Sequence, residues 1–180
     1  ITHRLQMDDG RIKVVQERCE TFYNAQGKAL RSIGTVQDIT LRTQIEERLR
    51  QAATVFASTR EGILISDADN RIVTVNPAFT TITGYSEAEV QGQNPRLFAS
   101  GRHSHAFYAA MWDSLNSTGY WQGELWNRRK NGEDYPEWLT IRAVRDGAGK
   151  ISHYIAVFAD ITESKQSQER LDYMAHYDAL

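Results

Sequence analysis

The amino-acid sequence contains an internal repeat, and this repeat limits the folds open to the chain more than any other feature. Asp38-Ile39-Thr40 returns 122 positions later as Asp160-Ile161-Thr162. Further matches keep the same offset: Gly10 with Gly132, Gly27-Lys28 with Gly149-Lys150, and Glu47-Arg48-Leu49 with Glu169-Arg170-Leu171. Such matches without an insertion indicate two copies of one folding unit. Because the first copy starts only nine residues before Gly10, we expect that its front half is missing.

Charge and composition exclude several classes of protein. The chain has 180 residues, with 21 Lys and Arg against 23 Asp and Glu, and a net charge of -2. This balance supplies no positive field for a phosphate backbone, so we expect no nucleic-acid partner. The one cysteine, Cys19, excludes an intramolecular disulfide and a cysteine-based metal cluster, and it fits a reducing compartment.

The chain also lacks a candidate membrane span. Its longest apolar run, residues 154–159, is far shorter than the ~20 residues that cross a bilayer. It does not open with Met or a signal peptide. We therefore expect a cytoplasmic segment of a longer protein, and we expect no membrane contact from this segment. Whether the intact protein has a membrane anchor elsewhere is left open.

Hydrophobic periodicity and turn residues predict the secondary structure. Ile45, Leu49, Ala52 and Phe56 recur at helical spacing, so we expect a helix over residues 41–57 with Thr40 as its N-cap. Runs rich in β-branched and aromatic residues, divided by turn clusters, predict strands. The expected strands are residues 62–66, 71–75, 120–129, 134–145 and 151–160, and the further helices are 78–83, a short one after Ser86, 104–116 and 163–175.

This order of elements and several motifs resemble the PAS family of sensor domains. The motifs are Gly62 to Asp67, Asn76 to Tyr85, Trp121 to Glu124, Asn127 to Gly132, and Asp160-Ile161-Thr162. The resemblance implies an α+β fold over residues 48–162, with a five-stranded antiparallel sheet and flanking short helices. Residues 1–40 resemble the last strands of an upstream PAS copy. Residues 41–57 and 163–180 then correspond to linker helices on either side of the complete domain.

The last ten residues, 171–180, resemble the lead-in to a GGDEF diguanylate cyclase domain. This likeness implies a cyclic di-GMP signalling protein, with or without an EAL phosphodiesterase domain. Within the segment itself, no Ser-His-Asp set, carboxylate pair or Gly-rich phosphate loop has a suitable spacing. We therefore expect that this segment is not an enzyme and that any catalysis belongs to the output domain.

A PAS fold has a pocket between its helices and the inner face of its sheet, and strand alternation indicates which side chains face it. In the strand that starts at Tyr120, the more apolar row contains Trp121, Gly123, Leu125 and Asn127. Asn127 is thus an amide on a core-facing row, where it needs a hydrogen-bond partner. We expect Gly123 to leave room in the pocket wall for a planar ring.

The run Asn127-Arg128-Arg129-Lys130 is similar to that of flavin-binding PAS domains from aerotaxis transducers and nitrogen-fixation redox regulators. These families place a Trp at the position of Trp112 and an Asn at that of Asn127, and both serve the flavin. The resemblance therefore implies FAD as cofactor, Trp112 and Asn127 as binding residues, and redox or oxygen sensing as the function. One position departs from this resemblance. The nitrogen-fixation regulators have a carboxylate near the position of Pro95, whereas this chain has no acid there, so we expect its pocket to differ at this point.

Residues 92–98 also resemble the photoreceptor branch of the family. Asn94 and Arg96 match residues of that branch, where the arginine meets the flavin phosphate, so both are expected at the cofactor. Pro95 occupies the place of the cysteine that forms the flavin photoadduct there. The resemblance thus excludes light sensing by that chemistry.

Other interpretations of these residues stay open. Trp112 shares a helical stripe with Tyr108 and Leu115, so it suits a core aromatic equally well, and Asn127 can bond to a neighbouring backbone group. His103 and His105 fit a solvated loop better than a metal site, and we expect no metal. The alternative function is a PAS dimerisation and relay module that binds another small ligand or none.

The repeated Asp-Ile-Thr motif precedes a charged helix in both copies and predicts how a signal leaves the domain. We expect Thr162 to cap a helix that starts at Glu163, and Asp160 to tie the strand end to the rest of the fold. Both residues would then relay the signal. The stripe from Ile45 to Phe56 predicts a homodimer through residues 41–57, whereas Leu171 with Met174 or Ala175 offers only a weak pairing surface.

Overall fold

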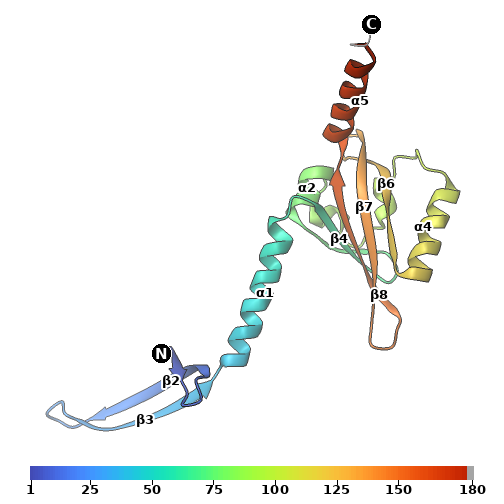
Figure 1. Cartoon of the computed structure of the whole chain (residues 1–180). Coiled ribbons are helices and arrows are strands. Elements are labelled where there is room, and N and C mark those ends of the chain that lie inside the picture. The colour runs from blue at the N-terminus through green and yellow to red at the C-terminus, as the bar shows by residue number, and fades with distance from the viewer. Residues whose placement is uncertain (178–180) are drawn as a thin grey trace. The chain divides into compact units, whose positions relative to one another are not determined.

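The computed structural model describes residues 1–177, which form two compact units, one of residues 1–54 and one from Val55 onward. The first unit is a three-stranded antiparallel sheet of β1 (Thr2–Gln6), β2 (Ile12–Tyr23) and β3 (Ala29–Asp38), in that order (Figure 1). Its hairpins turn at Gly10 and Gly27, whose positive φ angles of 82° and 77° favour glycine. Helix α1 (Thr40–Ser58) follows β3 directly, and none of its residues is buried.

The second unit has the expected α+β fold with a five-stranded antiparallel sheet. Its strands are β4 (Gly62–Asp67), β5 (Ile72–Val75), β6 (Tyr120–Arg128), β7 (Asp134–Arg145) and β8 (Ile151–Asp160), in the order β5-β4-β8-β7-β6. Between β5 and β6 lie α2 (Pro77–Thr83), α3 (Glu87–Val90), the 3-10 helix η1 (Pro95–Phe98) and α4 (His105–Thr118). Helix α5 (Thr162–Tyr177) continues from the end of β8 (Figure 1).

The ends of the short helices follow from their capping residues. The Asn76 side chain accepts a hydrogen bond from the Phe79 backbone at 2.9 Å and so caps α2, which begins with Pro77 and ends at Gly84 with φ of 79°. Ser86 and Glu89 form a capping box at α3. The positions predicted from Pro77, Gly84 and Ser86 are thus confirmed.

The two predicted threonine caps are wrong in detail. Helices α1 and α5 begin at Thr40 and Thr162 themselves, and each threonine hydroxyl donates to an aspartate two residues earlier, at 2.6 Å in both cases. The same carboxylates accept from the threonine backbone N–H groups, at 3.0 Å in the first copy and 2.8 Å in the second. The acceptor that starts each helix is therefore Asp38 or Asp160, because a carboxylate is the stronger acceptor for an N–H at this end.

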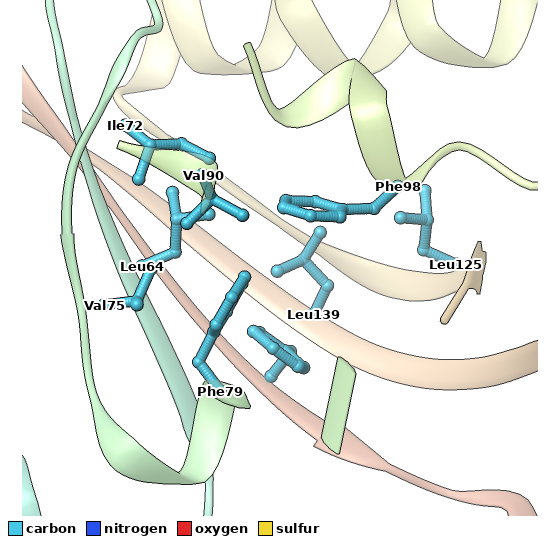
Figure 2. Close-up of a cluster of buried hydrophobic side chains, with 9 residues drawn as sticks. Leu64, Ile72, Val75, Phe79, Val90, Phe98, Leu125 and Leu139 are labelled. Carbon is cyan, nitrogen blue, oxygen red and sulfur yellow. The ribbon is translucent and has the colours of Figure 1, made fainter. Parts of the chain in front are cut away.

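The hydrophobic core of the second unit lies between the sheet and the short helices. Phe79 of α2 is at its centre, with its ring edge-on to Phe98 of η1 and Phe158 of β8 at centroid distances of 5.4 and 5.9 Å. Figure 2 shows how strand and helix residues converge here. The buried cluster consists of Leu64, Ile72, Val75, Phe79, Val90, Phe98, Leu125, Leu139 and Phe158.

The internal repeat extends to the pairing of individual residues. In the first copy Val15 pairs with Asp38, and in the second Glu137 pairs with Asp160, again 122 positions further along. Both ladders shift register at the same place, between Phe22 and Tyr23 and between Val144 and Arg145. The two copies therefore build the same strand ladder, although their side chains differ.

Candidate ligand-binding site

A cavity of about 530 Å³ lies within the second unit. Apolar side chains from the sheet and from α2, η1 and α4 form most of its wall, including the core residues Leu64, Phe79 and Leu139. This volume falls in the range that small-molecule pockets occupy. A few polar groups among these apolar walls would fix the orientation of a bound molecule.

One group of polar residues comes from adjacent strands of the sheet. Glu137 of β7 is buried, with 2% of its surface exposed, and it lines the cavity together with Asn127 and Tyr135. The Asn127 Nδ2 group donates to one carboxyl oxygen of Glu137 at 3.0 Å, and the Tyr135 hydroxyl donates to the other at 2.8 Å. Asn127 thus has the predicted partner, and it is a carboxyl group rather than a neighbouring backbone atom.

Burial dominates the ionisation of this cluster. It raises the pKa of Glu137 to about 7, against the opposing effect of the hydrogen bonds from Tyr135 and Asn127. Burial and the nearby carboxyl also raise the pKa of Tyr135, so its hydroxyl stays protonated and can donate. The cavity therefore contains an acid that changes charge near neutral pH.

Helix α4 contributes aromatic groups to the cavity wall. Trp112 lines the cavity and packs edge-on against Tyr154 of β8, with ring centroids 5.5 Å apart and an interplanar angle of 85°. Tyr108 also lines the cavity, and its buried hydroxyl has no hydrogen-bond partner within the described part of the chain. Burial and then the charge of Glu137 raise the pKa of this phenol. Tyr108 is thus a spare donor beside the site.

Of the two cofactor-binding residues expected beside Pro95, the structure places one, Arg96, in the cavity wall. Arg96 lines the cavity, is exposed, and forms no ion pair within the described residues. Asn94 does not line it, and its side chain instead accepts from the Arg96 backbone at 3.0 Å as the N-cap of η1. Arg96 thus stays a candidate ligand-binding residue on the cavity wall, whereas the observed role of Asn94 is to start the 3-10 turn.

Two expectations about neighbouring residues are wrong. A Cβ atom on Gly123 would lie 2.9 Å from the Trp121 ring, so this indole already covers the space that we expected for a planar ligand. His103 is not a solvated loop residue, because its Nε2 atom accepts from the Trp126 backbone at 2.8 Å and its ring stacks on Phe107. No group of three metal-ligating side chains occurs among the residues that the structure describes.

The end of β8 joins this site region to α5. Asp160 binds the guanidinium of Arg129 in addition to Thr162. Burial opposes the charge of Asp160, but the bonds from Thr162 and Arg129 keep the pKa of its carboxyl below the ordinary value. The Nζ group of Lys165 donates to Glu124 at 2.5 Å and lies 5.7 Å from the Trp126 ring centre, which fixes the first turns of α5 to β6.

A comparison with known families shows the class of this domain. The PAS domain family matches residues 60–163, which is more than half of the chain. The chain therefore belongs to the PAS family, as its fold and its pocket indicate. None of the described helices has the length and apolar character needed to cross a membrane.

The similar proteins include sensors and regulators. The nitrogen fixation regulatory protein of Klebsiella oxytoca is 36% identical over 118 residues, which cover 66% of this chain and 24% of that protein. The aerotaxis receptor of Escherichia coli K12 is 33% identical over 101 residues, covering 56% and 20%. This chain thus spans about a quarter of these relatives or less.

Solved structures confirm the fold. The PAS domain of a Colwellia psychrerythraea protein has a TM-score of 0.61 at 20% identity, covering 64% of this chain and 98% of that one. An RNA-binding light-oxygen-voltage receptor has a TM-score of 0.60 at 16% identity, covering 98% and 81%. The second likeness includes the region of the first copy as well.

The residue that sequence analysis missed is Glu137. Its signal was present, because Tyr135, Glu137, Leu139 and Ile141 alternate along β7 and the other three are apolar or aromatic. An acid in such a row faces the core and is therefore a candidate site residue.

Proposed function

We propose that this PAS domain binds FAD and senses redox state or oxygen. The observation that supports this most is the apolar cavity with Asn127 and Glu137 among its lining residues and Trp112 on α4. The likeness to the nitrogen fixation regulatory protein and the aerotaxis receptor supports the same assignment. Bound FAD would supply a ring system that accepts and releases electrons reversibly.

The residues present suit such a cofactor. The Asn127 amide and the Glu137 carboxyl can bond the polar edge of a planar ring, and Trp112 offers it an aromatic surface. Arg96 lines the cavity, is exposed and has no acidic partner in the described chain, so it can bind a phosphate group. The ring system would then occupy the apolar part of the cavity, and Arg96 would bind a phosphate group of the dinucleotide.

Loss of flavin from variants tests this assignment. We expect Asn127→Ala and Trp112→Ala each to weaken FAD binding about tenfold or more, because each removes a group from the cavity wall. Fluorescence titration with FAD measures the effect. Trp138→Ala is the matched control, since Trp138 is 45% exposed and outside the cavity. Equal FAD affinity in all four proteins would overturn the assignment.

A second candidate is a dimerisation and relay module with a different, smaller ligand. It is favoured by the position of Asn94, which lies away from the cavity wall and so leaves fewer groups for a large cofactor. Failure to bind FAD, combined with stabilisation by another small molecule, would support this candidate.

We propose further that the domain regulates a cyclic di-GMP output domain and functions as a homodimer. The first part rests on the resemblance of residues 171–180 to the lead-in of a diguanylate cyclase, and residues 178–180 lie outside the described part of the chain. The second part rests on the apolar stripe of α1. The enzymatic activity would belong to the intact protein rather than to this segment.

A further inference from the structure

A continuous set of contacts leads from the cavity to the start of α5. It begins at Glu137, whose carboxyl oxygens are held by Asn127 at 3.0 Å and by the Tyr135 hydroxyl at 2.8 Å. The guanidinium carbon of Arg129 lies 4.0 Å from the centre of the Tyr135 ring, on the ring's face. The ring of Tyr135 thus contacts the cavity acid through its hydroxyl and a cation through its face.

Arg129 continues the contacts toward the helix. It donates to the carboxylate of Asp160, and it also donates to the backbone oxygen of Ile82 at the end of α2. Asp160 in turn accepts from the backbone and the hydroxyl of Thr162, the first residue of α5. Only 16% of the Arg129 side chain and 28% of the Asp160 side chain are exposed, so solvent screens this ion pair less than one on the open surface.

The first copy of the repeat shows the same helix start without this connection. There Asp38 binds Thr40 as Asp160 binds Thr162, but its ion pair is with Lys13 at 2.9 Å. These two side chains are 38% and 44% exposed. Lys13 takes the position of Tyr135 in the repeat, and Val15 takes that of Glu137.

The contrast separates two functions of the motif. Both copies hold the first turn of a helix through an aspartate and a threonine. Only the copy with the cavity joins that aspartate to an acid in the cavity wall. In the first copy the helix starts with Lys13 as the ion-pair partner of Asp38, so this helix start occurs without a Tyr and Arg pair like Tyr135 and Arg129.

We propose that Tyr135 and Arg129 are positioning residues that transmit the hydrogen-bonding state of Glu137 to Asp160, and through it to the first turn of α5. The inference deepens the proposed function, on which it rests only for the identity of the ligand that acts on Glu137. A ligand group can donate a hydrogen bond to the Glu137 carboxylate, or it can accept one from the protonated carboxyl. Either bond changes the direction of the Tyr135 O–H bond. The change alters the interaction of the ring with Arg129 and hence the hold of Arg129 on Asp160.

The substitution Glu137→Gln imitates such a change without any ligand. Its amide places a donor where one carboxyl oxygen stood, so either Asn127 or Tyr135 faces a donor instead of an acceptor. The Thr162 amide, which bonds to Asp160, reports the far end by its NMR chemical shift and its hydrogen-exchange rate. We expect Glu137→Gln to change that exchange rate about threefold to tenfold, as coupling energies between linked sites imply.

The effect of Glu137 on the Thr162 amide must disappear when the contacts between them are removed. In Tyr135→Phe, which lacks the hydroxyl, a further Glu137→Gln change should leave the Thr162 amide unaltered. Arg129→Lys keeps a cation for Asp160 but not the planar group on the ring, and it should abolish the response in the same way. If Tyr135→Phe does not fold, Arg129→Lys decides the test. The Thr40 amide, bound to Asp38 in the first copy, is the internal control and should not respond.

Two results would overturn the proposal: an unchanged Thr162 amide in Glu137→Gln, or an equal response with and without the Tyr135 hydroxyl. A final comparison adds FAD to the parent chain and to Tyr135→Phe, and the Thr162 amide should shift only in the parent. If FAD does not bind either protein, the proposed cofactor is wrong, whereas the variant series still decides whether Glu137 and Thr162 are coupled.

Discussion

Glu137 is the residue whose environment departs most from that of an ordinary surface acid. It is enclosed by the core, and its two hydrogen bonds only partly offset the loss of water around the carboxylate. A buried acid of this kind costs stability when it is charged. Its presence in the cavity wall therefore points to a role in the site rather than to a contribution to the fold.

The stability of the domain should depend on the charge of Glu137. Because folding raises the pKa of this carboxyl from 4.5 to about 7, the folded state keeps a proton that the unfolded state releases within that pH window. The free energy of unfolding should then fall by about 3 kcal/mol as the pH rises from 4.5 to above 7. Urea unfolding of the parent and of Glu137→Gln at several pH values measures this difference.

The Glu137→Gln variant has no carboxyl group to ionise at this position, so its free energy of unfolding should not fall for this reason. Its advantage in stability over the parent should therefore be largest at pH 8. Glu61→Gln is a suitable control, because Glu61 is exposed and lies outside the cavity. Parallel pH profiles for the parent and Glu137→Gln would show that the buried carboxyl does not titrate near neutral pH.

The sequence alone located part of this site. Alternation along β6 placed Asn127 on the inner face, and helical spacing placed Trp112 on a stripe with Tyr108 and Leu115. The expectation for Gly123 was wrong, because its neighbour Trp121 covers the space, and the role of Asn94 as the cap of η1 was not foreseen. Local hydrogen bonds and side-chain directions of this kind are decided by three-dimensional packing, which a linear pattern does not contain.

At the scale of elements, turn chemistry determined most boundaries. Strands β7 and β8 have the predicted bounds, since Asn131-Gly132 precedes β7 and the Asp146 turn separates β7 from β8. Strand β6 ends one residue earlier than expected. The starts of α1 and α5 could not be predicted fully. A threonine after an aspartate suits either capping role, and only the geometry of the strand end shows that the aspartate is the acceptor.

Removal of the Asp160 carboxylate should loosen the junction between β8 and α5. Asp160→Ala eliminates the acceptor for two bonds from Thr162 and the partner of Arg129, so we expect a loss of about 1 to 3 kcal/mol in the free energy of unfolding. In the intact protein the output should no longer follow the stimulus, while ligand binding persists. Urea unfolding, FAD titration and an output assay measure the three effects.

Asp38→Ala is the matched control, because it breaks the equivalent motif of the first copy. It should leave the unfolding of residues 60–163 and the response to the stimulus unchanged. A normal response in Asp160→Ala would show that this junction does not transmit the signal.

Helix α1 should mediate dimerisation. Ile45 and Leu49 are 49% and 66% exposed in the single chain, and they lie on one face with Ala52 and Phe56. Leu49→Lys places a charge in this stripe and should shift the chain from dimer to monomer in sedimentation experiments. Gln51→Lys adds the same charge on another face of the helix and should not. A monomeric parent at high concentration would contradict this prediction.

At the scale of the whole molecule, the chain joins one copy of the repeat, seen here as a three-stranded sheet, to a second copy that forms the five-stranded PAS sheet. The shared register shows that the strand ladder is encoded in both, whereas the cavity acid and its contacts exist only in the second copy. The apolar residues Leu30 and Val36 of β3 are exposed, so this strand offers a surface on which a further element can pack. Which surface covers them is a property of an assembly and is not encoded in local sequence patterns.

The central claim is that the cavity of the second unit is a flavin site. The absorption spectrum of the purified chain, after saturation with FAD and removal of the excess, tests it most directly. We expect the bands of bound oxidised flavin at about one FAD per chain, bleached by a chemical reductant and restored by air. A spectrum without flavin bands, with no saturable uptake of FAD, would contradict the claim.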